Sequence, residues 1–543
     1  GSSMGINIDR IGQGYQLSAT SGTLSGKSAP FNITASQLRF SSEPGNTKAG
    51  ATFGAEVVAT DSYGTIDTTF TGQVTLGLTG GPGGVSLKPI ASPMAAAVNG
   101  KANFGNALLI DRVGQAYKLT ASSGSLNAFS SAFNITANQL RFTTSPGNTQ
   151  AGTQFNVVVE ATDNFGNVDT TFASPVTLWL SGGALLATLE PSGALTATAA
   201  NGEASFSGLH IDRIGQGYVL LASGGGLNGK SAPFNITASQ FRFWPAPGNT
   251  RADATFMVTV LATDGYGSID TTFTSSVTLG LVGGTDGAIL SSPGSLTIAA
   301  VNGQAPFSGL SINRVGQNYR LQATGGGLAG QSAAFNVTAS KLTFQSSPTT
   351  RRANDDLGAI VVQATDSFGT VDTTYTGLVS LGLTGGNASA SLENGIVVVA
   401  ASNGVAKFSS ALRISYVGQN YQLTAASGPL SGLSAGFNIT ADRLMGPGVV
   451  ISAANKQVGT LVIYAADGHG TIDTFNSYTV TLTILSVFPS GPGKFVPDQE
   501  RTQTTVNGMA DFGNLKINQD ATYTVEASSP GLLSTNLTWF VVP

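Results

Sequence analysis

The sequence predicts an all-β protein made of tandem Greek-key β-sandwiches arranged as an elongated rod. Three observations lead to this prediction: a repeat of roughly one hundred residues, an Asn-Gly pair in each repeat, and a Tyr-x-Leu/Val-x-Ala phrase near the end of each repeat. A unit of this length is longer than a helical or leucine-rich solenoid repeat. It matches a small sandwich that buries its own hydrophobic core.

The repeat is easiest to follow in the segment ATDSYGTIDTTFTGQVTLGL, which begins at Ala59. Related segments begin at Ala161, Ala262, Ala364 and, more loosely, Ala465, so that successive copies are 102, 101, 102 and 101 residues apart. This period divides the chain into a partial domain at 1–34, repeats at 35–136, 137–237, 238–338 and 339–440, and a divergent last domain at 441–543.

The partial domain matches only the end of each later repeat. It supplies about three of the roughly seven strands that such a sandwich needs, so it cannot close a core by itself. The opening residues GSSMG look like a leftover of expression or an arbitrary cut. We therefore expect the native protein to extend further towards its N-terminus.

Composition excludes several classes of function. Charged residues make up only 10% of the chain, the net charge is −4, and no basic run is present, which argues against a nucleic acid or an anionic membrane as partner. The absence of cysteine excludes disulfides and Cys-ligated metals. No apolar run approaches the roughly 18 residues of a membrane span. This composition suits an extracellular or cell-surface bacterial protein.

Strand and turn signals follow the same order in every repeat. In the first repeat we expect strands at 37–40, 53–60 and 74–78. The pair Asn99 and Gly100 predicts a two-residue hairpin, because both central residues must take positive φ. The pair returns at 201–202, 302–303, 403–404 and 507–508, and a phenylalanine expected in the core follows each time, at Phe104, Phe206, Phe307, Phe408 and Phe512.

A tyrosine opens the next strand in every unit. These residues are Tyr15, Tyr117, Tyr218, Tyr319, Tyr421 and Tyr523. In Greek-key sandwiches, a tyrosine at the start of strand F forms a tyrosine corner, in which its hydroxyl is hydrogen-bonded to the backbone a few residues earlier in the chain. The final strand, Phe-Asn-Ile-Thr, alternates apolar with polar residues, so Phe and Ile should point inwards.

Together these motifs resemble a known family. Pro-Gly-Asn-Thr at 44–47, the Asp-x-x-Gly turn, Asn-Gly-x-Ala-x-Phe and Gly-x-x-Tyr-x-Leu-x-Ala are similar to bacterial immunoglobulin-like repeats of large surface proteins, over the whole of 1–543. The resemblance implies tandem immunoglobulin-like domains like those in the stalks of invasin- and intimin-like adhesins. Such modules serve as spacers, filaments and binding tips. Nothing matches a C-type-lectin-like tip.

The junctions between repeats are short. About two residues separate the last strand of one domain from the first strand of the next, with no Pro-rich or charged linker. Neighbouring domains should therefore touch, and domains of roughly 40 Å would give a semi-rigid rod of roughly 200 Å. The weakly charged surface and the mean hydropathy of +0.14 further predict that such rods self-associate.

Two aspartates flank the turn in each repeat. The pairs are Asp61/Asp67, Asp163/Asp169, Asp264/Asp270, Asp366/Asp372 and Asp467/Asp473. Clustered carboxylates can bind Ca²⁺, but a six- to eight-oxygen shell needs more acids than two. The alternative is structural: the first Asp closes an Asx-turn in which a glycine such as Gly64 takes positive φ, and the second Asp caps the following segment. The sequence favours the structural interpretation.

Two further polar patterns recur. Asn32, Asn134, Asn235, Asn336 and Asn438 form Asn-x-Thr sequons, which are either glycosylation sites or ordinary outward positions of the last strand. The Asp-Arg pair at 9–10, 111–112 and 212–213 becomes Asn-Arg, Ser-Tyr and Asn-Gln in later units. Because a ligand-binding acid would not be dispensable from repeat to repeat, this pair is interpreted as a surface position.

Two loops depart from the pattern. The fourth repeat carries two Arg and two Asp between Pro348 and Asp356, which predicts a local ion-paired contact. The last domain has a charged segment at 494–501 and ends in an apolar strand at 538–542, so it is a candidate terminal cap.

Catalysis has few residues to draw on. The two histidines, His210 and His469, lie at different positions of different repeats, and no Gly-x-Ser-x-Gly elbow is present. We therefore expect a protein that is not an enzyme and has no cofactor. The leading hypothesis is the structural shaft of an extracellular bacterial fibre, surface layer or adhesin that self-associates. The alternative is an adhesin that binds a glycan or a host protein through repeated loops or its last domain.

Overall fold

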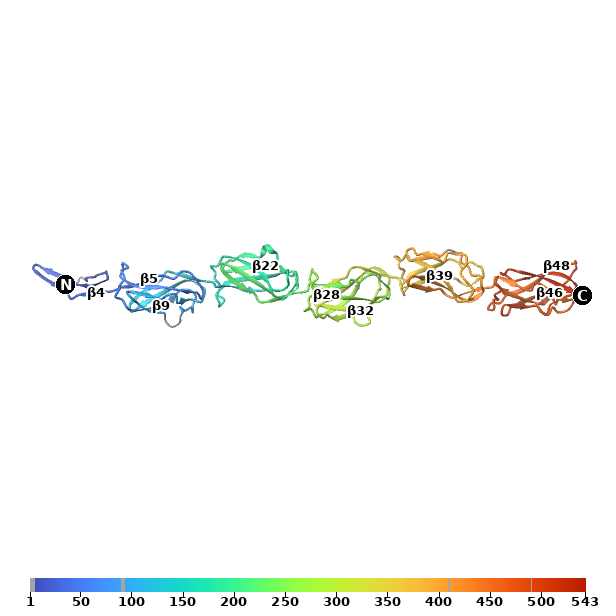
Figure 1. The fold of residues 1–543 in the computed structure, drawn as a ribbon, viewed down its shortest axis with the longest axis horizontal. Coiled ribbons are helices and arrows are strands. Elements are labelled where there is room, and N and C mark those ends of the chain that lie inside the picture. Colours follow the sequence, from blue (N-terminus) through green and yellow to red (C-terminus); the bar gives the residue numbers. More distant parts are fainter. Residues whose placement is uncertain (1–4, 89–92, 409–410, 490) are drawn as a thin grey trace. The chain divides into compact units, whose positions relative to one another are not determined.

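The computed structural model describes residues 5–88, 93–408, 411–489 and 491–543 (Figure 1). Of the opening GSSMG, residues 1–4 lie outside this description. The described residues form β-strands and two short 3₁₀ helices, so the all-β prediction is confirmed. Within them, no helix has the length and apolar character that crossing a membrane requires.

The chain forms two compact units. One comprises 1–241 with 261–274 and 301–304, and the other comprises 242–260, 275–300 and 305–543. The boundary passes through the third repeat.

The first unit begins with the partial domain and repeat 35–136. The partial domain has β1 (Gly12–Tyr15), which pairs with β4 (Phe31–Ile33), and β2 (Ser18–Ser21), which pairs with β3 (Leu24–Lys27). The repeat contains β5 (Gln37–Ser42), β6 (Thr47–Lys48), β7 (Thr52–Phe53), β8 (Glu56–Thr60), β9 (Gln73–Thr79), β10 (Met94–Ala96), β11 (Lys101–Asn103), β12 (Leu108–Leu109), β13 (Gly114–Ser123), β14 (Leu126–Phe129) and β15 (Phe133–Thr136).

One strand prediction in this repeat is wrong in detail. The strand expected at 53–60 is divided into β7 and β8, which are separated by Gly54 and Ala55. A Cβ at Gly54 would lie 2.4 Å from the carbonyl oxygen of Gly105. The break faces a matching break in the partner strand, because β8 pairs with β11 and β7 pairs with β12.

Repeat 137–237 shows the sandwich most completely. It contains β16 (Gln139–Thr144), β17 (Thr149–Gln150), β18 (Phe155–Thr162), β19 (Pro175–Ser181), β20 (Leu189–Glu190), η1 (Ser192–Ala194), β21 (Thr196–Thr198), β22 (Glu203–Ile211), β23 (Gly215–Gly224), β24 (Leu227–Lys230) and β25 (Phe234–Thr237). One sheet has the order β16-β18-β22-β20, and the other has the order β17-β25-β23-β19-β21, with β24 also on β23. This is an immunoglobulin-like arrangement, and the predicted fold class is confirmed.

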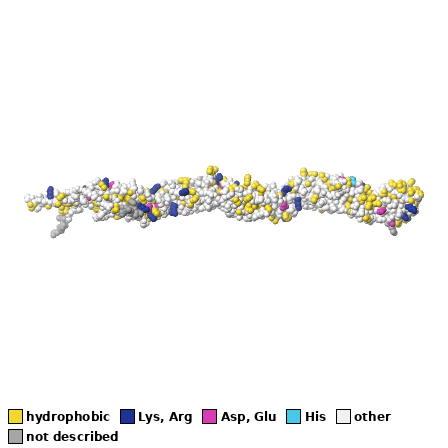
Figure 2. Space-filling view, turned by 60° about the horizontal axis from the view of Figure 1, so that its bottom comes forward, with side chains coloured by type: hydrophobic (Ala, Val, Ile, Leu, Met, Phe, Trp, Pro, Cys, Tyr) yellow, Lys and Arg dark blue, Asp and Glu magenta, His cyan; other side chains and the backbone are white. Residues whose placement is uncertain are grey.

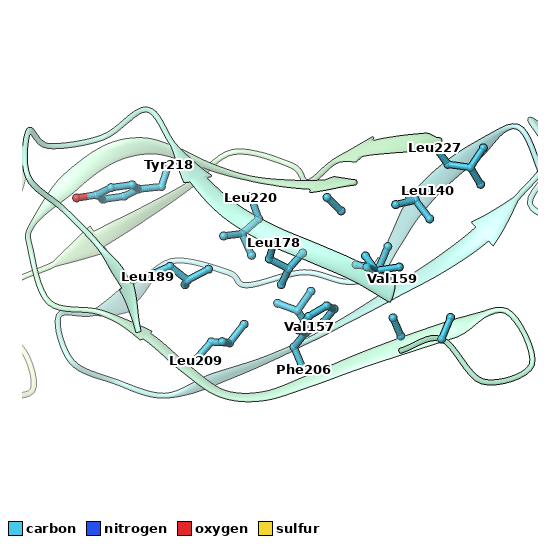
Figure 3. Packing of buried hydrophobic residues seen from close by; sticks show 14 of the residues in the cluster. Leu140, Val157, Val159, Leu178, Leu189, Phe206, Leu209, Tyr218, Leu220 and Leu227 are labelled. Carbon is cyan, nitrogen blue, oxygen red and sulfur yellow. The ribbon is translucent and has the colours of Figure 1, made fainter. Parts of the chain in front are cut away.

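The core of this repeat lies between the two sheets (Figure 3). Val157 and Val159 of β18 and Phe206 of β22 face Leu178 of β19 and Leu220 of β23, and these five side chains are at most 3% exposed. The predicted core phenylalanine is therefore buried where two β-sheets pack face to face.

The third repeat spans the boundary between the units, and repeat 339–440 lies wholly in the second unit. The third contains β26 (Gln240–Trp244), β27 (Thr250–Arg251), β28 (Phe256–Thr263), β29 (Ser276–Val282), β30 (Leu290–Ser291), β31 (Thr297–Ala299), β32 (Gln304–Ile312), β33 (Gly316–Gly325), β34 (Leu328–Gln331) and β35 (Phe335–Thr338). The fourth contains β36 (Lys341–Ser346), β37 (Arg351–Arg352), β38 (Ile360–Thr365), β39 (Leu378–Thr384), β40 (Val398–Ala400), β41 (Val405–Phe408), β42 (Gly418–Ser427), β43 (Leu430–Leu433) and β44 (Phe437–Thr440).

The last domain completes the second unit. It contains β45 (Arg443–Met445), β46 (Val449–Ala453), β47 (Val462–Ala466), β48 (Thr479–Phe488), β49 (Phe495–Val496), η2 (Asp498–Arg501), β50 (Thr502–Thr504), β51 (Met509–Asp511), β52 (Lys516–Ile517), β53 (Ala521–Ser528) and β54 (Thr535–Val542). Its larger sheet has the order β46-β54-β53-β48-β50. The edge strand β46 has five residues, whereas its counterpart β17 has two.

The Asn-Gly pairs form the predicted turn but not an extended hairpin. Asn99 and Gly100 have φ of 51° and 79°, and Val98 and Lys101 exchange backbone hydrogen bonds across the turn. The strands on either side then separate, because β10 pairs with β9 in one sheet and β11 pairs with β8 in the other. The turn therefore carries the chain between sheets, and the predicted hairpin does not continue beyond the Val98–Lys101 pair.

Candidate functional site: the junctions between repeats

The first aspartate of each pair binds its own turn and the preceding domain. In the second repeat, Asp163 Oδ1 accepts hydrogen bonds from the backbone N–H groups of Phe165 and Asn167 at 2.9 and 3.0 Å. Its Oδ2 accepts one from the backbone N–H of Val113, in the preceding repeat, at 2.9 Å. Gly166 has a φ of +87°, as an Asx-turn at this position requires. One carboxylate thus joins a local turn to a neighbouring domain.

The second aspartate binds the connecting segment. Asp169 Oδ1 accepts hydrogen bonds from the backbone N–H and the hydroxyl of Thr171, at 3.0 and 2.6 Å. Its Oδ2 accepts a hydrogen bond of 2.9 Å from the backbone N–H of Ala137, which directly follows strand β15. Only two residues separate β15 from β16, so this bond holds one of the two connecting residues in place.

The same arrangement recurs at every junction. The other first aspartates accept backbone N–H hydrogen bonds from the preceding domain: Asp61 from Ile11 (3.2 Å), Asp264 from Ile214 (3.1 Å), Asp366 from Val315 (2.9 Å) and Asp467 from Val417 (2.7 Å). The second aspartates form the bonds Asp67–Ala35 (2.9 Å), Asp270–Ala238 (2.9 Å), Asp372–Ala339 (2.9 Å) and Asp473–Ala441 (3.1 Å). All ten side chains are at most 4% exposed.

Hydrogen bonding lowers the pKa of five of these buried carboxylates. Burial alone would raise the pKa of Asp163, but hydrogen bonds from the Asn167 side chain and from three backbone N–H groups hold that pKa below its ordinary value. The pKa values of Asp61, Asp67, Asp264 and Asp366 are lowered in the same way, with burial again opposing the hydrogen bonds.

The ten aspartates were also the candidate calcium ligands. Their oxygens point at N–H and O–H donors of the turns and connections rather than at a shared centre. In the described part of the chain, no three His, Asp, Glu or Cys side chains gather in a group that could hold a metal ion. The hydrogen bonds show the Asx-turn of the structural interpretation, and the expectation that these aspartates bind no metal stays a prediction.

The Asp-Arg pair lies on the surface at the junctions, exposed in the partial domain and partly exposed in the next two repeats, and it makes contacts there that the sequence did not predict. The guanidinium carbon of Arg112 is 4.5 Å from the ring centre of Phe165, the aromatic residue in the next repeat's turn. Equivalent cation–π pairs are Arg10/Tyr63 at 4.4 Å, Arg213/Tyr266 at 4.2 Å and Arg314/Phe368 at 4.4 Å. The preceding Asp also has a role, since Tyr63 and Tyr266 donate hydroxyl hydrogen bonds of 2.7 Å to Asp9 and Asp212.

The last junction uses different residues for the same contact. Tyr416 takes the place of the arginine and stacks on His469, with ring centres 4.1 Å apart and planes inclined by 7°. The Nε2 atom of His469 lies 3.1 Å from the Ser415 hydroxyl, which donates at 2.6 Å to Glu393. A nucleophilic serine would give its proton to the histidine. Here the buried Ser415 gives it to a carboxylate, which suits a structural contact.

The tyrosines occupy corners of the sandwich. Tyr117, Tyr218, Tyr319 and Tyr421 donate their hydroxyl hydrogen bonds to the backbone carbonyls of residues 112, 213, 314 and 416, at 3.0 to 3.2 Å, and Tyr523 donates to that of Gln519 at 2.8 Å. Burial raises the pKa of Tyr117 to about 12. In the partial domain, Tyr15 is half-buried and its ring centre lies 6.3 Å from that of Phe31.

The sequon asparagines support a bulge that sequence reasoning missed. Asn235 Oδ1 accepts a hydrogen bond of 2.9 Å from the backbone N–H of Gly217, whose φ is +68°. The pairing of β23 with β25 shifts register at this point. Asn32, Asn134, Asn336 and Asn438 make the corresponding bonds to residues 14, 116, 318 and 420, which all have positive φ. The recurring Gly-Gln-Gly/Ala/Asn-Tyr phrase was the available signal.

The charged loop of the fourth repeat contains the expected ion pair. Arg352 lies 3.4 Å from Asp355, and both side chains are nearly half exposed. The same arginine donates to the backbone carbonyl of Gly531 in the last domain, and Asn354 donates at 3.0 Å to Asp442. This loop therefore contributes to the last junction.

Comparisons with known proteins add structural neighbours without a family. No protein-family description and no curated protein sequence matches the chain. Among solved structures, it is similar to the Escherichia coli adhesin FdeC, with 15% identity over 55% of this chain and 95% of that chain and a TM-score of 0.26. It is also similar to invasin, a bacterial integrin-binding protein, with 15% identity over 74% and 79% and a TM-score of 0.23. A three-domain immunoglobulin segment of titin gives 14% identity over 56% and 99%, with a TM-score of 0.29. The fold assignment rests on the sheets described above.

Proposed function

We propose that this chain is a structural shaft of an extracellular bacterial fibre, surface layer or adhesin, that it self-associates, and that it is not an enzyme. The observation that supports a shaft is the pair of buried aspartates at each junction, whose Oδ2 atoms accept N–H groups of the preceding domain and of the connection. A binding module on a flexible tether would not need this arrangement.

Physical chemistry favours stiffness at such a junction. Hydrogen bonds to a charged acceptor contribute about 1.5–3 kcal/mol each, and an N–H left unpaired in a buried site costs a comparable amount. Bending at the junction would break both bonds and separate the cation–π pair. The two-residue connection leaves little chain to absorb such a bend. Each junction therefore resists hinge motion, which is the property that a shaft needs.

The proposal is tested by small-angle scattering on the whole chain. The wild type should give a maximum dimension on the order of 200 Å, as tandem sandwiches of this size would. Replacing the five first aspartates by asparagine keeps the side-chain shape but removes one acceptor at each junction, and should broaden the distribution of end-to-end distances. Asp286→Asn, in an exposed loop, is the matched control. A wild type less than about half as long, or as flexible as the junction variant, would contradict the shaft.

A further inference from the structure

The last domain carries an apolar surface at a position where the earlier repeats are polar. Strand pairing aligns Ile451 of β46 with Phe540 of β54, Phe540 with Thr522 of β53, and Thr522 with Phe488 of β48. Residues paired in register point to the same face of a sheet, so these four side chains form one row across it. Val449 and Val542 lie in the neighbouring rows.

The apolar residues of this row and the two neighbouring valines face outwards. The exposed fractions are 65% for Ile451, 40% for Phe540, 78% for Phe488, 55% for Val449 and 45% for Val542. The alternate residues of β54, Leu537, Trp539 and Val541, are buried. Figure 2 shows hydrophobic side chains gathered over this C-terminal domain. We call the five exposed residues the apolar face of the last domain.

The second repeat shows what the ordinary residues would be. Phe234 pairs with the corner tyrosine Tyr218 as Trp539 pairs with Tyr523, so Asn235 is the counterpart of Phe540. On the neighbouring strand, Asn148 is the counterpart of Ile451, and its Oδ1 accepts the backbone N–H of Asn235 at 2.8 Å. A polar pair that hydrogen-bonds within the sheet is thus replaced by two large apolar side chains.

The substitution has no internal structural reason. Asn235 is needed to support the bulge at Gly217, whereas β53 and β54 pair without a bulge through Ala521, Thr522 and Tyr523. Freedom from the bulge removes the need for asparagine but does not call for phenylalanine, because an exposed threonine would satisfy an outward strand position. An exposed apolar cluster of this kind marks an interaction surface.

We propose that the apolar face of the last domain binds the same face of a second copy of this chain. At the observed exposures its five side chains offer on the order of 500 Å², since a whole aromatic side chain offers roughly 200 Å². Two such faces would bury about 1,000 Å², which is the lower limit for a specific interface. Glu526 is the only charged residue in β46, β48, β53 and β54, so two copies meet little repulsion.

A face-to-face pair of this size binds weakly. Interfaces near the lower limit of area form transient complexes, so a dissociation constant in the range of about 1–100 μM is expected. A weak contact made by every chain is sufficient when many chains lie side by side, because the contacts then act together. The inference rests on the proposed self-association and names the surface that produces it.

Sedimentation velocity on the whole chain, up to about 200 μM, tests the inference. The double variant Ile451→Asn with Phe540→Asn installs the pair found in the second repeat, and Phe488→Thr is an independent single change. The matched control is Leu185→Thr with Leu186→Asn, two exposed leucines of the second repeat that lie outside the face. Thermal melting verifies that each variant is folded.

The wild type and the control should dimerise with the same dissociation constant, and both face variants should weaken dimerisation at least tenfold. If the wild type associates and the face variants associate equally well, this inference fails while self-association stands. A wild type that stays monomeric at every concentration would overturn both this inference and the proposed self-association. The same holds if the monomeric wild type binds an apolar dye at this face. A control that weakens association as much as the face variants would also overturn the inference.

Discussion

Asp163 accepts a hydrogen bond of 2.9 Å from the backbone N–H of Val113, which lies fifty residues earlier in the preceding repeat. The bond connects two domains through one side-chain oxygen while the other oxygen holds a turn. Both tasks depend on the carboxylate being charged and buried. The junction is therefore sensitive to changes that alter one oxygen without altering shape.

Replacing Asp366 by asparagine should weaken the junction between the third and fourth repeats. One side-chain oxygen becomes an N–H₂ group, which cannot accept from Val315, or, if the amide is reversed, from Phe368 and Thr370. An unpaired buried N–H costs about 1–3 kcal/mol. Chemical denaturation of the whole chain should show this loss, whereas Asp286→Asn should change stability by less than about 0.5 kcal/mol. Equal effects of the two variants would contradict the role of Asp366.

Acid should destabilise the junctions. The pKa values of Asp61, Asp67, Asp163, Asp264 and Asp366 are lowered below the ordinary value of 3.8. A lowered folded-state pKa means that the stabilisation is present above the ordinary value and is lost as pH falls through the folded-state value. The melting temperature should therefore hold from neutral pH to about pH 4 and then fall. A smaller fall in Asp366→Asn would assign part of the effect to this carboxylate, whereas identical curves would argue against it.

Tyr218→Phe should destabilise its own repeat by about 2 kcal/mol, because the two hydrogen bonds of its hydroxyl are lost and each contributes about 1 kcal/mol. The hydroxyl donates to the backbone carbonyl of Arg213 and accepts from the backbone N–H of Ala184. Calorimetry should show one lowered transition beside unchanged neighbours. Tyr266→Phe is the control, since that hydroxyl is at the exposed junction surface and bonds Asp212. A uniform shift of all transitions would mean that the domains unfold together.

Asn235→Ala and Thr237→Val both remove the sequon, but only the first should matter for stability. Asn235 satisfies the N–H of the bulge residue Gly217, so its loss should cost about 1 kcal/mol. Thr237 makes a longer hydrogen bond of 3.3 Å to Thr149, and valine occupies the equivalent position in the last domain. Equal destabilisation in material from a glycosylating host would instead indicate that a glycan stabilises the fold.

Chelation should leave the melting temperature nearly unchanged, because the aspartate oxygens already accept N–H and O–H donors. A fall of more than about 5 °C with EDTA, on the order of 1 kcal/mol for a domain of this size, would support calcium binding by the Asp pairs. Adding calcium back should then restore the original value.

Local signals in the sequence predicted the sandwich and its turns well. The Asx-turn at Asp61 and the positive φ of Asn99 depend on neighbours within four residues, and such preferences can be deduced from residue types. The Asn-Gly pair does not reveal that its flanking strands enter different sheets. That outcome depends on partners distant in the chain.

The junction contacts required information from two repeats at once. The second oxygen of each aspartate binds a backbone N–H, which carries no residue signature. The stacking partners did leave a signal: where the arginine is replaced by Tyr416, the aromatic residue in the next turn is replaced by His469. Comparing one position at a time across the repeats, as the Asp-Arg interpretation did, cannot reveal such paired changes.

The aspartates at each junction recognise main-chain N–H groups, and every amino acid except proline supplies the same group. Newly adjacent repeats can therefore form these two hydrogen bonds even where a whole repeat is gained or lost by unequal recombination. The length of the array can change in steps of one domain without new contacts having to evolve. The last domain, with its own stacking pair, is the unit that such exchange would not replace freely.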